Sequence, residues 1–211
     1  MVEIRRAGPA DVPLIADVLE MASRAHLDRG AWDLMFPDAS DRQQALQLLA
    51  GGEPSWCHRQ VFLVAEQDGE PAAALAGFEP RSIGGTELGP ALGAIFQKLG
   101  FSPDRMAEVA GPMGTYLSCF PDLPEDVWIV ENVGTRAAFR RRGLVAALLD
   151  HVLEEGRARG LATAQISCLI GNTPAFHAYE RVGFRAVEEL KTPEFHALMG
   201  EPGFMRMTLA L

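Results

Sequence analysis

The order of the predicted elements favours a mixed α/β fold, in which helices flank a largely antiparallel sheet. Short runs of β-branched and aromatic residues alternate with stretches whose apolar residues recur every three or four positions. Two of the predicted strands, residues 60–66 and 70–78, meet at Asp68-Gly69, a dipeptide typical of a tight hairpin and so of antiparallel pairing. Farther along, residues 127–153 read as a strand that runs through a basic turn into an amphipathic helix.

The apolar patterns place the elements in order along the chain. Strands are expected at residues 2–4, 60–66, 70–78, 127–133, 164–169, 183–189 and 204–211. Helices are expected around residues 11–19, 41–50, 92–99, 106–117, 144–153 and 174–179, with a turn or short helix within residues 26–37. In this pattern Asp11 and Thr173 stand at helix N-caps, and Gly160 supplies a C-cap.

The composition is that of a soluble globular protein. The chain has 211 residues, 48% of them hydrophobic and 22% charged, which suits one domain with an ample core. A net charge of −9 argues against a nucleic-acid surface. The chain shows no signal-peptide core and no apolar run near the roughly 20 residues that span a bilayer, so no membrane association is expected.

The cysteines also limit the possible classes of protein. Cys57, Cys119 and Cys168 lie far apart and form no C-x-x-C pair. Neither a zinc site nor a disulfide framework is therefore indicated, and no metal is expected. Free thiols are typical of a reducing compartment, so the expected location is the cytoplasm.

Residues 127–153 have the layout of an anion site. They read V-W-I-V-E-N-V-G-T-R-A-A-F-R-R-R-G-L-V-A-A-L-L-D-H-V-L. The first N–H groups of a helix lack an intrahelical partner and the helix dipole is positive at that end, so a phosphate would fit beside these arginines. Neither G-x-x-x-x-G-K-S/T nor a G-x-G-x-x-G after a strand occurs, which excludes two common phosphate loops. On this stretch alone, an ordinary turn with solvated arginines is an equal alternative.

The turn resembles the pyrophosphate loop of the GNAT superfamily of N-acetyltransferases, whose pattern is Q/R-x-x-G-x-G/A. Arg140 fills the first position of that pattern and Gly143 the second. Val145 stands where the family has Gly or Ala. This departure matters little if the backbone N–H is the ligand, but the larger side chain could crowd a pyrophosphate.

A second block, I-S-C-L-I-G-N-T-P-A-F-H-A-Y-E-R-V-G-F, resembles a later motif of the same family, N-x-x-A-x-x-x-Y-x-x-x-G-F. The matching positions are Asn172, Ala175, Tyr179, Gly183 and Phe184. Two motifs in this order are more specific than either one alone. The resemblance covers residues 127–190 well and the N-terminus loosely.

The resemblance implies one GNAT-like domain over residues 1–211, with the sheet splayed between its fourth and fifth strands. It implies acetyl-CoA as the acetyl donor, bound along the end of one strand and at the basic turn. The residues implied to bind the cofactor are Val133, Gly134, Thr135, Arg140, Arg141, Arg142, Gly143, Leu144, Val145, Ala146 and Asn172. Two roles stay open: Arg141 and Arg142 either reach the ribose phosphate or lie solvated, and Asn172 either orients the cofactor arm or only stabilises the turn.

The same resemblance implies that Tyr179 is the general acid, because a protonated phenol can donate to the departing thiolate. The alternative is a buried tyrosine whose hydroxyl satisfies a backbone group. The base is less direct: some relatives carry a glutamate twelve positions ahead of the tyrosine, where this chain has Ser167. Glu131, inside an apolar strand where its pKa tends to rise, is the best substitute. The alternative for Glu131 is an ion pair with an arginine.

Two classes of function follow from these residues. The first is an acetyl-CoA-dependent N-acetyltransferase that acts on a primary amine of a small molecule or a protein, by direct attack on the thioester. The second is a catalytically weak acyl-CoA-binding regulatory module. This alternative remains because Val145 and Ser167 depart from the family pattern. Acceptor specificity is expected to lie in residues 24–50 and 81–126. The latter is expected to be a helical insertion beside the acceptor cleft, or alternatively the surface of a homodimer.

Overall fold

The computed structural model describes residues 2–82 and 85–211. Its strands are β1 (Val2–Arg6), β2 (Phe62–Gln67), β3 (Glu70–Phe78), β4 (Trp128–Thr135), β5 (Thr163–Leu169), β6 (Arg185–Lys191) and β7 (Gly203–Ala210). Its helices are α1 (Val12–Arg24), α2 (Ala31–Met35), α3 (Ala39–Gly51), α4 (Gly85–Lys98), α5 (Pro103–Leu117), α6 (Leu144–Ala158), α7 (Thr173–Arg181) and α8 (Pro193–Met199). The strands predicted from the sequence are confirmed to within two residues at each end.

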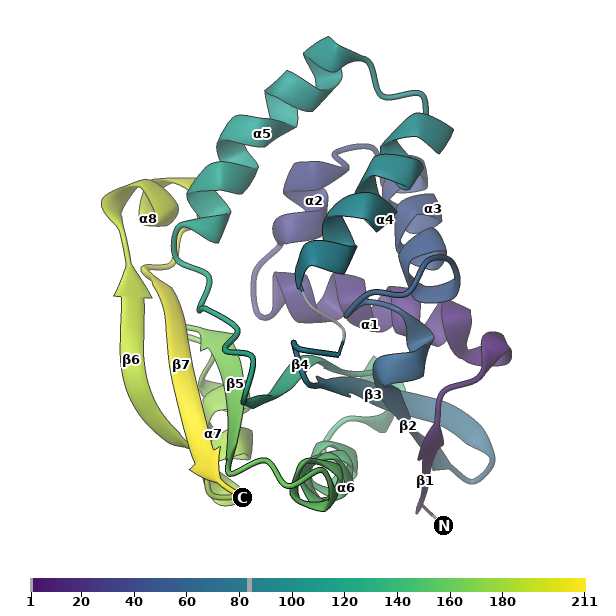
Figure 1. The fold of residues 1–211 in the computed structure, drawn as a ribbon, viewed down its shortest axis with the longest axis vertical. Coiled ribbons are helices and arrows are strands. Elements are labelled where there is room, and N and C mark those ends of the chain that lie inside the picture. Colours follow the sequence, from purple (N-terminus) through teal and green to yellow (C-terminus); the bar gives the residue numbers. More distant parts are fainter. Residues whose placement is uncertain (1, 83–84) are drawn as a thin grey trace.

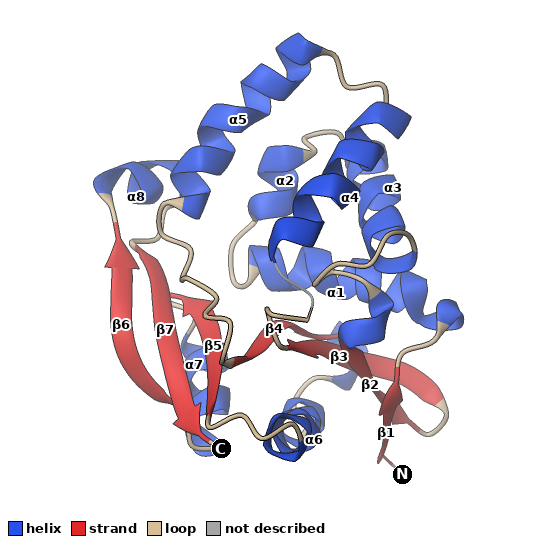
Figure 2. Cartoon of the chain, viewed as in Figure 1, coloured by secondary structure: helices blue, strands red, loops and turns tan. Residues whose placement is uncertain are grey.

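The strands form one sheet with the order β1-β2-β3-β4-β5-β7-β6. All neighbouring strands pair antiparallel except β4 and β5, which are parallel. This pair is short: it joins Trp128–Val130 to Ala164–Ile166, although β4 continues to Thr135 and β5 to Leu169. The two strands therefore part, and Figure 2 shows β5, β7 and β6 standing apart from the rest of the sheet. The predicted mixed sheet and its splay are confirmed.

Helices cover both faces of the sheet, with α1, α2 and α3 on one side and α6 on the other (Figure 1). On α6 the side chains of Leu144, Leu148 and Val152, spaced four apart, are all buried, as the sequence pattern predicts. None of the helices in the described part of the chain has the length and apolar character that crossing a bilayer requires.

Several helix starts differ from the sequence prediction, most of all that of α4, which begins at Gly85 rather than near residue 92, and two of the shifts follow from capping. The N-cap of α7 is Asn172 rather than Thr173, and its Oδ1 accepts a hydrogen bond from the N–H of Ala175 at 3.4 Å. Helix α3 begins at Ala39, two residues before the predicted start, because the carboxylate of Asp38 caps its first turn. Asn and Asp are both favourable N-cap residues. In each case such a residue, just upstream of the predicted start, determines where the helix begins.

Asp11 occupies the N-cap position predicted for it, but its side chain has another role. Asp11 stands at the N-cap position of α1, but its side chain makes no capping bond to that helix. The carboxylate instead accepts the backbone N–H of Gly8 at 2.7 Å and pairs with the guanidinium of Arg5 at 2.7 Å. The bonds from Arg5, more than offsetting the effect of burial, hold the pKa of Asp11 below its usual value.

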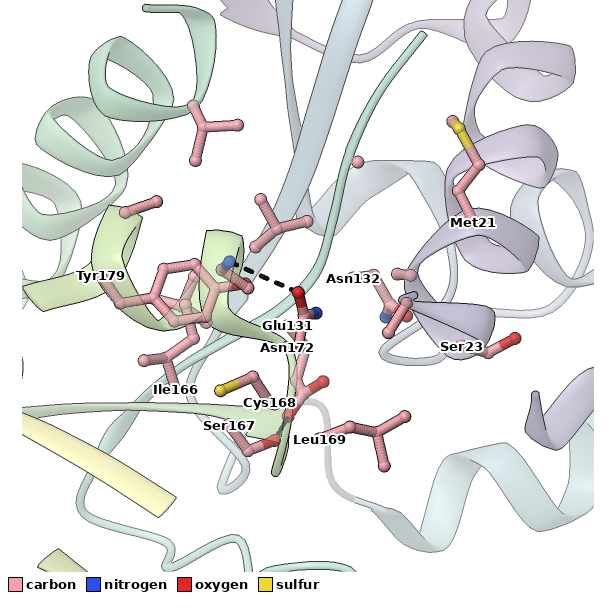
Figure 3. Close-up of a pocket in the computed structure, with 18 of the residues that line it drawn as sticks. Met21, Ser23, Glu131, Asn132, Ile166, Ser167, Cys168, Leu169, Asn172 and Tyr179 are labelled. Atoms are coloured by element: carbon pink, nitrogen blue, oxygen red, sulfur yellow. Dashed lines mark hydrogen bonds between the residues drawn. The ribbon is translucent and has the colours of Figure 1, made fainter. Parts of the chain in front are cut away.

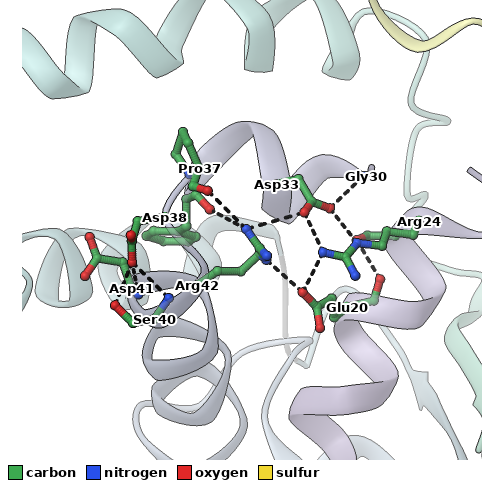
Figure 4. Close-up of polar contacts among 11 residues, drawn as sticks. Glu20, Arg24, Gly30, Asp33, Pro37, Asp38, Ser40, Asp41 and Arg42 are labelled. Atoms are coloured by element: carbon green, nitrogen blue, oxygen red, sulfur yellow. Dashed lines mark hydrogen bonds and ion pairs between the residues drawn. The ribbon is translucent and has the colours of Figure 1, made fainter. Parts of the chain in front are cut away.

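A charged network fastens α2 to α1 and α3 (Figure 4). Arg42 of α3 is nearly buried; its Nε donates to Oε1 of Glu20 at 2.7 Å, and its Nη1 donates to the carbonyl of Phe36 at 2.9 Å. Asp33 of α2 pairs with Arg24 at 2.6 Å and with Arg42 at 3.4 Å. Because a buried charge is costly without partners, these bonds fix the short helix α2 in one position.

We expect Arg42→Leu to destabilise the protein by about 1–3 kcal/mol, because it leaves Glu20, Asp33 and the Phe36 carbonyl without one donor each. Arg157→Leu is the matched control, since Arg157 and its partner Glu154 are 41% and 74% exposed. Exposed pairs contribute only about 0–1 kcal/mol. Urea denaturation of both variants measures the difference, and equal losses would show that the network is not what holds α2.

Candidate functional site

A cavity of about 930 Å³ opens where β4 and β5 part. Its walls come from the two strands, the start of α6, one side of α7, and the helices α1, α2, α4 and α5. Every residue that the sequence singled out for cofactor binding or catalysis lines this cavity. Figure 3 shows Glu131, Cys168, Asn172 and Tyr179 gathered at its centre. The structure thus brings the candidate residues together, while their roles stay predictions.

The basic turn ends at the N-terminus of α6, which borders the cavity. Gly143 is the N-cap, with a left-handed φ of +80°, and a Cβ placed there would meet no atom within 4 Å. The first helical bond runs from the N–H of Ala147 to the Gly143 carbonyl at 3.1 Å. The N–H groups from Gly143 to Ala146 therefore have no acceptor within the helix and are available to an anion.

The arginines of the turn differ in what they contact. Arg140 donates from Nε to the Thr135 carbonyl at 3.3 Å, which ties the turn back to β4. Arg142 donates to the Ala138 carbonyl at 3.0 Å, and its guanidinium lies 5.2 Å from the ring centre of Phe139. Both side chains remain exposed, as does that of Arg141. Their charge adds to the positive end of the helix dipole.

Beyond Val130, the edge of β4 that faces β5 has no strand partner. Two buried polar side-chain atoms on this segment, Nδ2 of Asn132 and Oγ1 of Thr135, have no hydrogen-bond partner in the described part of the chain. Asn132 also has a positive φ of 53°, and the pairing register with β3 shifts beside it. A bulge of this kind bends a strand and frees polar groups, which suits the binding of an extended amide-rich chain.

Glu131 lies at the point where the two strands separate. Its Oε1 accepts a hydrogen bond from Oγ of Ser167 at 3.3 Å, so the serine at the position where some relatives carry a glutamate contacts the residue predicted to act as the base. No arginine pairs with Glu131 among the described residues, which excludes the ion-pair alternative there. Desolvation, opposed by the bonds from Ser167 and the Asn132 backbone, raises the pKa of Glu131 to about 7.

Tyr179 projects from α7 into the same cavity, with 6% of its surface exposed. Its ring packs edge-on against Phe184, with the ring centres 6.4 Å apart. Its hydroxyl makes no hydrogen bond within the described chain, so the alternative role of satisfying a backbone group finds no support. Burial, together with the nearby Cys168 and Glu131, raises the pKa of Tyr179 above its usual value. The phenol is therefore protonated at neutral pH.

The far side of the cavity was predicted only as the segments 24–50 and 81–126, and for each apolar side chain there a core role was at least as easily expected. Trp32 and Met35 come from α2, and Met113 and Tyr116 come from α5. Each fits a helix stripe as an ordinary core residue, so nothing in the sequence marks it as a cavity wall. For Asn132 a signal existed, because two polar residues in an apolar strand are unusual and Asn tolerates a positive φ.

Residues 28–184 match the family model described as the acetyltransferase (GNAT) family. No curated protein matches the sequence significantly. No group of three or more side chains suited to hold a metal occurs among the described residues.

Solved structures share the fold at low sequence identity. An N-acetyltransferase from Staphylococcus aureus Mu50 has a TM-score of 0.69 and 20% identity, over 98% of this chain and 100% of that one. A GCN5-related N-acetyltransferase from Kribbella flavida has a TM-score of 0.59 and 18% identity, over 100% of this chain and 98% of that one. A ribosomal-protein-alanine N-acetyltransferase from Brucella melitensis has a TM-score of 0.54 and 18% identity, over 99% of each chain.

Proposed function

Because the chain belongs to the acetyltransferase (GNAT) family and uses acetyl-CoA as its donor, we propose that it acetylates a primary amine by direct attack on the thioester. The acceptor is the amine of a small molecule or of a protein. One observation carries this proposal: Glu131 and Tyr179 face the same cavity as the open N-terminus of α6. A donor held at that helix end can place its thioester between a base and an acid.

The proposed donor site uses two features of the chain. The N–H groups from Gly143 to Ala146 bind the pyrophosphate, aided by the charge of the neighbouring arginines. The unpaired edge of β4 from Val133 to Thr135 binds the amide groups of the pantetheine arm. The unpartnered Oγ1 of Thr135 is one polar atom there that is available to them. Asn172 already caps α7 through its Oδ1, so its role in orienting the arm falls to its amide N–H groups.

The proposed chemistry needs one proton removed and one supplied. Glu131 accepts a proton from the acceptor's ammonium group, and the neutral nitrogen then forms a bond to the thioester carbonyl carbon. As the tetrahedral intermediate collapses, the C–S bond breaks and the sulfur leaves with the bonding electrons. Tyr179 donates its proton to that thiolate. One of the two protons left on the nitrogen passes to the Tyr179 phenolate as the amide forms, so amine and thioester become amide and free thiol.

We also propose that residues 1–211 form one domain, in which residues 81–126 are a helical insertion that closes the acceptor side. Its described helices, α4 and α5, both line the cavity. A homodimer surface on this insertion stays the alternative. The three cysteines are free and buried, which suits the reducing cytoplasm that we propose as the location.

We expect acetyl-CoA to raise the Tm of the wild-type protein, because a ligand bound only by the native state stabilises it. Gly143→Asp should abolish most of that shift, because it adds bulk and negative charge at the pyrophosphate site. Gly160→Asp is the matched control: Gly160 follows the other end of α6, has a φ of +76°, and likewise has open space around an added Cβ. Both variants carry similar backbone strain, so only the position of the charge differs.

The Tm of each protein is measured with and without about 1 mM acetyl-CoA. At this concentration both tight and moderate binding raise the Tm measurably. Loss of the shift in both variants would assign the effect to strain rather than to the anion site. Release of free thiol from acetyl-CoA in the presence of a panel of primary amines then tests turnover itself. A Tm shift without thiol release from any amine would contradict the proposed acetyl transfer.

A further inference from the structure

The acceptor half of the cavity is apolar. Its wall is formed by large uncharged side chains from α2, α4, α5, the loop before β2 and the segment after α5, among them Trp32, Met35, Trp56, Leu92, Met113 and Phe120. Among the described residues, its polar members are limited to Ser23, His26 and Tyr116. Small-molecule sites usually combine an apolar lining with a few polar groups that fix orientation, and here those groups are sparse.

Charge within the cavity is divided between its two ends. Of the described residues that line it, the arginines 140, 141, 142 and 181 all belong to the side formed by α6 and α7. Glu131, at the strand fork, is the single carboxylate among those described residues. His26 is engaged with Glu201 at 3.0 Å. A ligand with one cationic group could therefore pair with Glu131, but a second cationic group would find no carboxylate among the described lining residues.

The wall is preformed rather than loosely packed. Trp32, Met35, Met113 and Tyr116 are each less than one tenth exposed. Tyr116 packs against Phe195 and Phe204, with the ring centres 5.5 Å apart in both pairs. Helix α2, which carries Trp32 and Met35, is fixed by the charged network around Arg42. A ligand therefore contacts a rigid apolar surface, so its binding costs little conformational entropy of the protein.

Besides the Glu131 carboxylate at the strand fork, the phenol of Tyr116 is a polar group that lines this cavity. The hydroxyl of Tyr116 makes no hydrogen bond within the described chain. Desolvation, and to a lesser extent the charge of Glu131, raise the pKa of this phenol above its usual value, so it is a neutral group at neutral pH.

We infer that the acceptor is a small monoamine whose body, beyond the reacting nitrogen, is an aryl or alkyl group without charge. This assignment rests on the proposed function and narrows it to one substrate class. The nitrogen lies beside Glu131, and the apolar body contacts the wall formed by α2 and α5. A second cationic group on the ligand would be desolvated without a partner, which costs binding free energy. A peptide amine would leave its backbone polar groups unpaired there.

The inference is tested by measuring kcat/KM for two isosteric acceptors, hexylamine and cadaverine, with saturating acetyl-CoA. They differ in a terminal methyl group against a terminal ammonium group. Because hydrophobic pockets discriminate such differences by roughly tenfold or more, we expect kcat/KM for hexylamine to exceed that for cadaverine by at least about tenfold. Phenethylamine should react as well as hexylamine or better, while agmatine and an alanine-initiated tetrapeptide should react poorly. Calorimetric binding of hexylamine to the protein loaded with CoA gives a second readout.

A variant pair locates the preference on the wall. Leu117, on α5, lines the cavity and is 56% exposed, so Leu117→Asp should fold normally. It should shift the hexylamine-to-cadaverine ratio of kcat/KM toward cadaverine by about tenfold, because it supplies a second carboxylate. Met106→Asp is the control, since Met106 is an exposed residue of the same helix that does not line the cavity. The ratio does not depend on how much protein is folded.

Several outcomes would overturn the inference. Equal or faster turnover of cadaverine or agmatine would contradict an apolar acceptor, while the proposed acetyl transfer would stand. Faster transfer to agmatine from octanoyl-CoA than from acetyl-CoA would assign the apolar wall to the donor's acyl chain instead. Thiol release from no amine at all, together with no binding of hexylamine, would refute the proposed function and this inference with it.

Discussion

Tyr179→Phe should lower kcat by about 10²–10⁴-fold, the usual contribution of general acid catalysis. The substitution removes the hydroxyl that faces the cavity and keeps the ring that packs against Phe184. Since the hydroxyl has no hydrogen-bond partner in the described chain, its loss leaves no buried group unpaired. Stability and the affinity for acetyl-CoA should therefore change little. Steady-state rates with saturating acetyl-CoA and thermal denaturation test these expectations together.

Tyr116→Phe is the informative comparison, because the chain's other tyrosine is also buried in this cavity and also lacks a hydrogen-bond partner among the described residues. It should act mainly on KM for the amine, and far less on kcat than Tyr179→Phe does. A purely structural role of Tyr179 makes the opposite forecast: a loss of about 1–3 kcal/mol of stability with turnover nearly intact. A stable Tyr179→Phe protein with the wild-type single-turnover rate would remove this residue from the mechanism.

The donor side of the site was predictable from sequence because its chemistry depends on local backbone. The strand, the basic turn and the helix start were predicted from residues 127–153, and each forms as expected; the parting of β4 from β5, which the family resemblance implies, also occurs. The errors there are small: the cap of α7 shifted by one residue because Asn172 competes with Thr173 for the same turn. Local competition between two good capping residues depends on geometry that sequence spacing does not contain.

The acceptor side was not predictable in the same way. Trp32 and Tyr116 lie more than eighty positions apart in sequence, in two different helices, and both have the spacing of core residues. Whether such a side chain faces the core or a cavity depends on how far α2 and α5 stand from β4. That placement depends on long-range contacts such as the pairs of Arg42 with Glu20 and Asp33. A pattern within one helix carries no information about such distances.

Glu131→Gln should reduce kcat/KM by about 10²–10⁴-fold and alter its pH dependence. Desolvation raises the pKa of Glu131 from the usual 4.5 to about 7, so a base role requires activity to rise as pH increases through about 7. In the variant this rise should vanish, leaving only the titration of the amine itself. Ser167→Ala is a finer test: it removes the donor to Oε1, so the pKa of Glu131 should increase and the rise should move to higher pH.

Stability gives an independent check on the same carboxyl group. In wild type the unfolded chain releases this proton near pH 4.5, whereas the folded chain holds it to about pH 7. The free energy of unfolding therefore decreases as pH rises between these values, and the stabilisation present at low pH is lost. Glutamine never ionises, so the Tm of Glu131→Gln should exceed that of wild type by a margin that grows from about pH 4.5 to about pH 7 and then levels. A margin that is constant with pH would show that Glu131 titrates normally, and an unshifted carboxylate would be a poor base for an ammonium substrate at neutral pH.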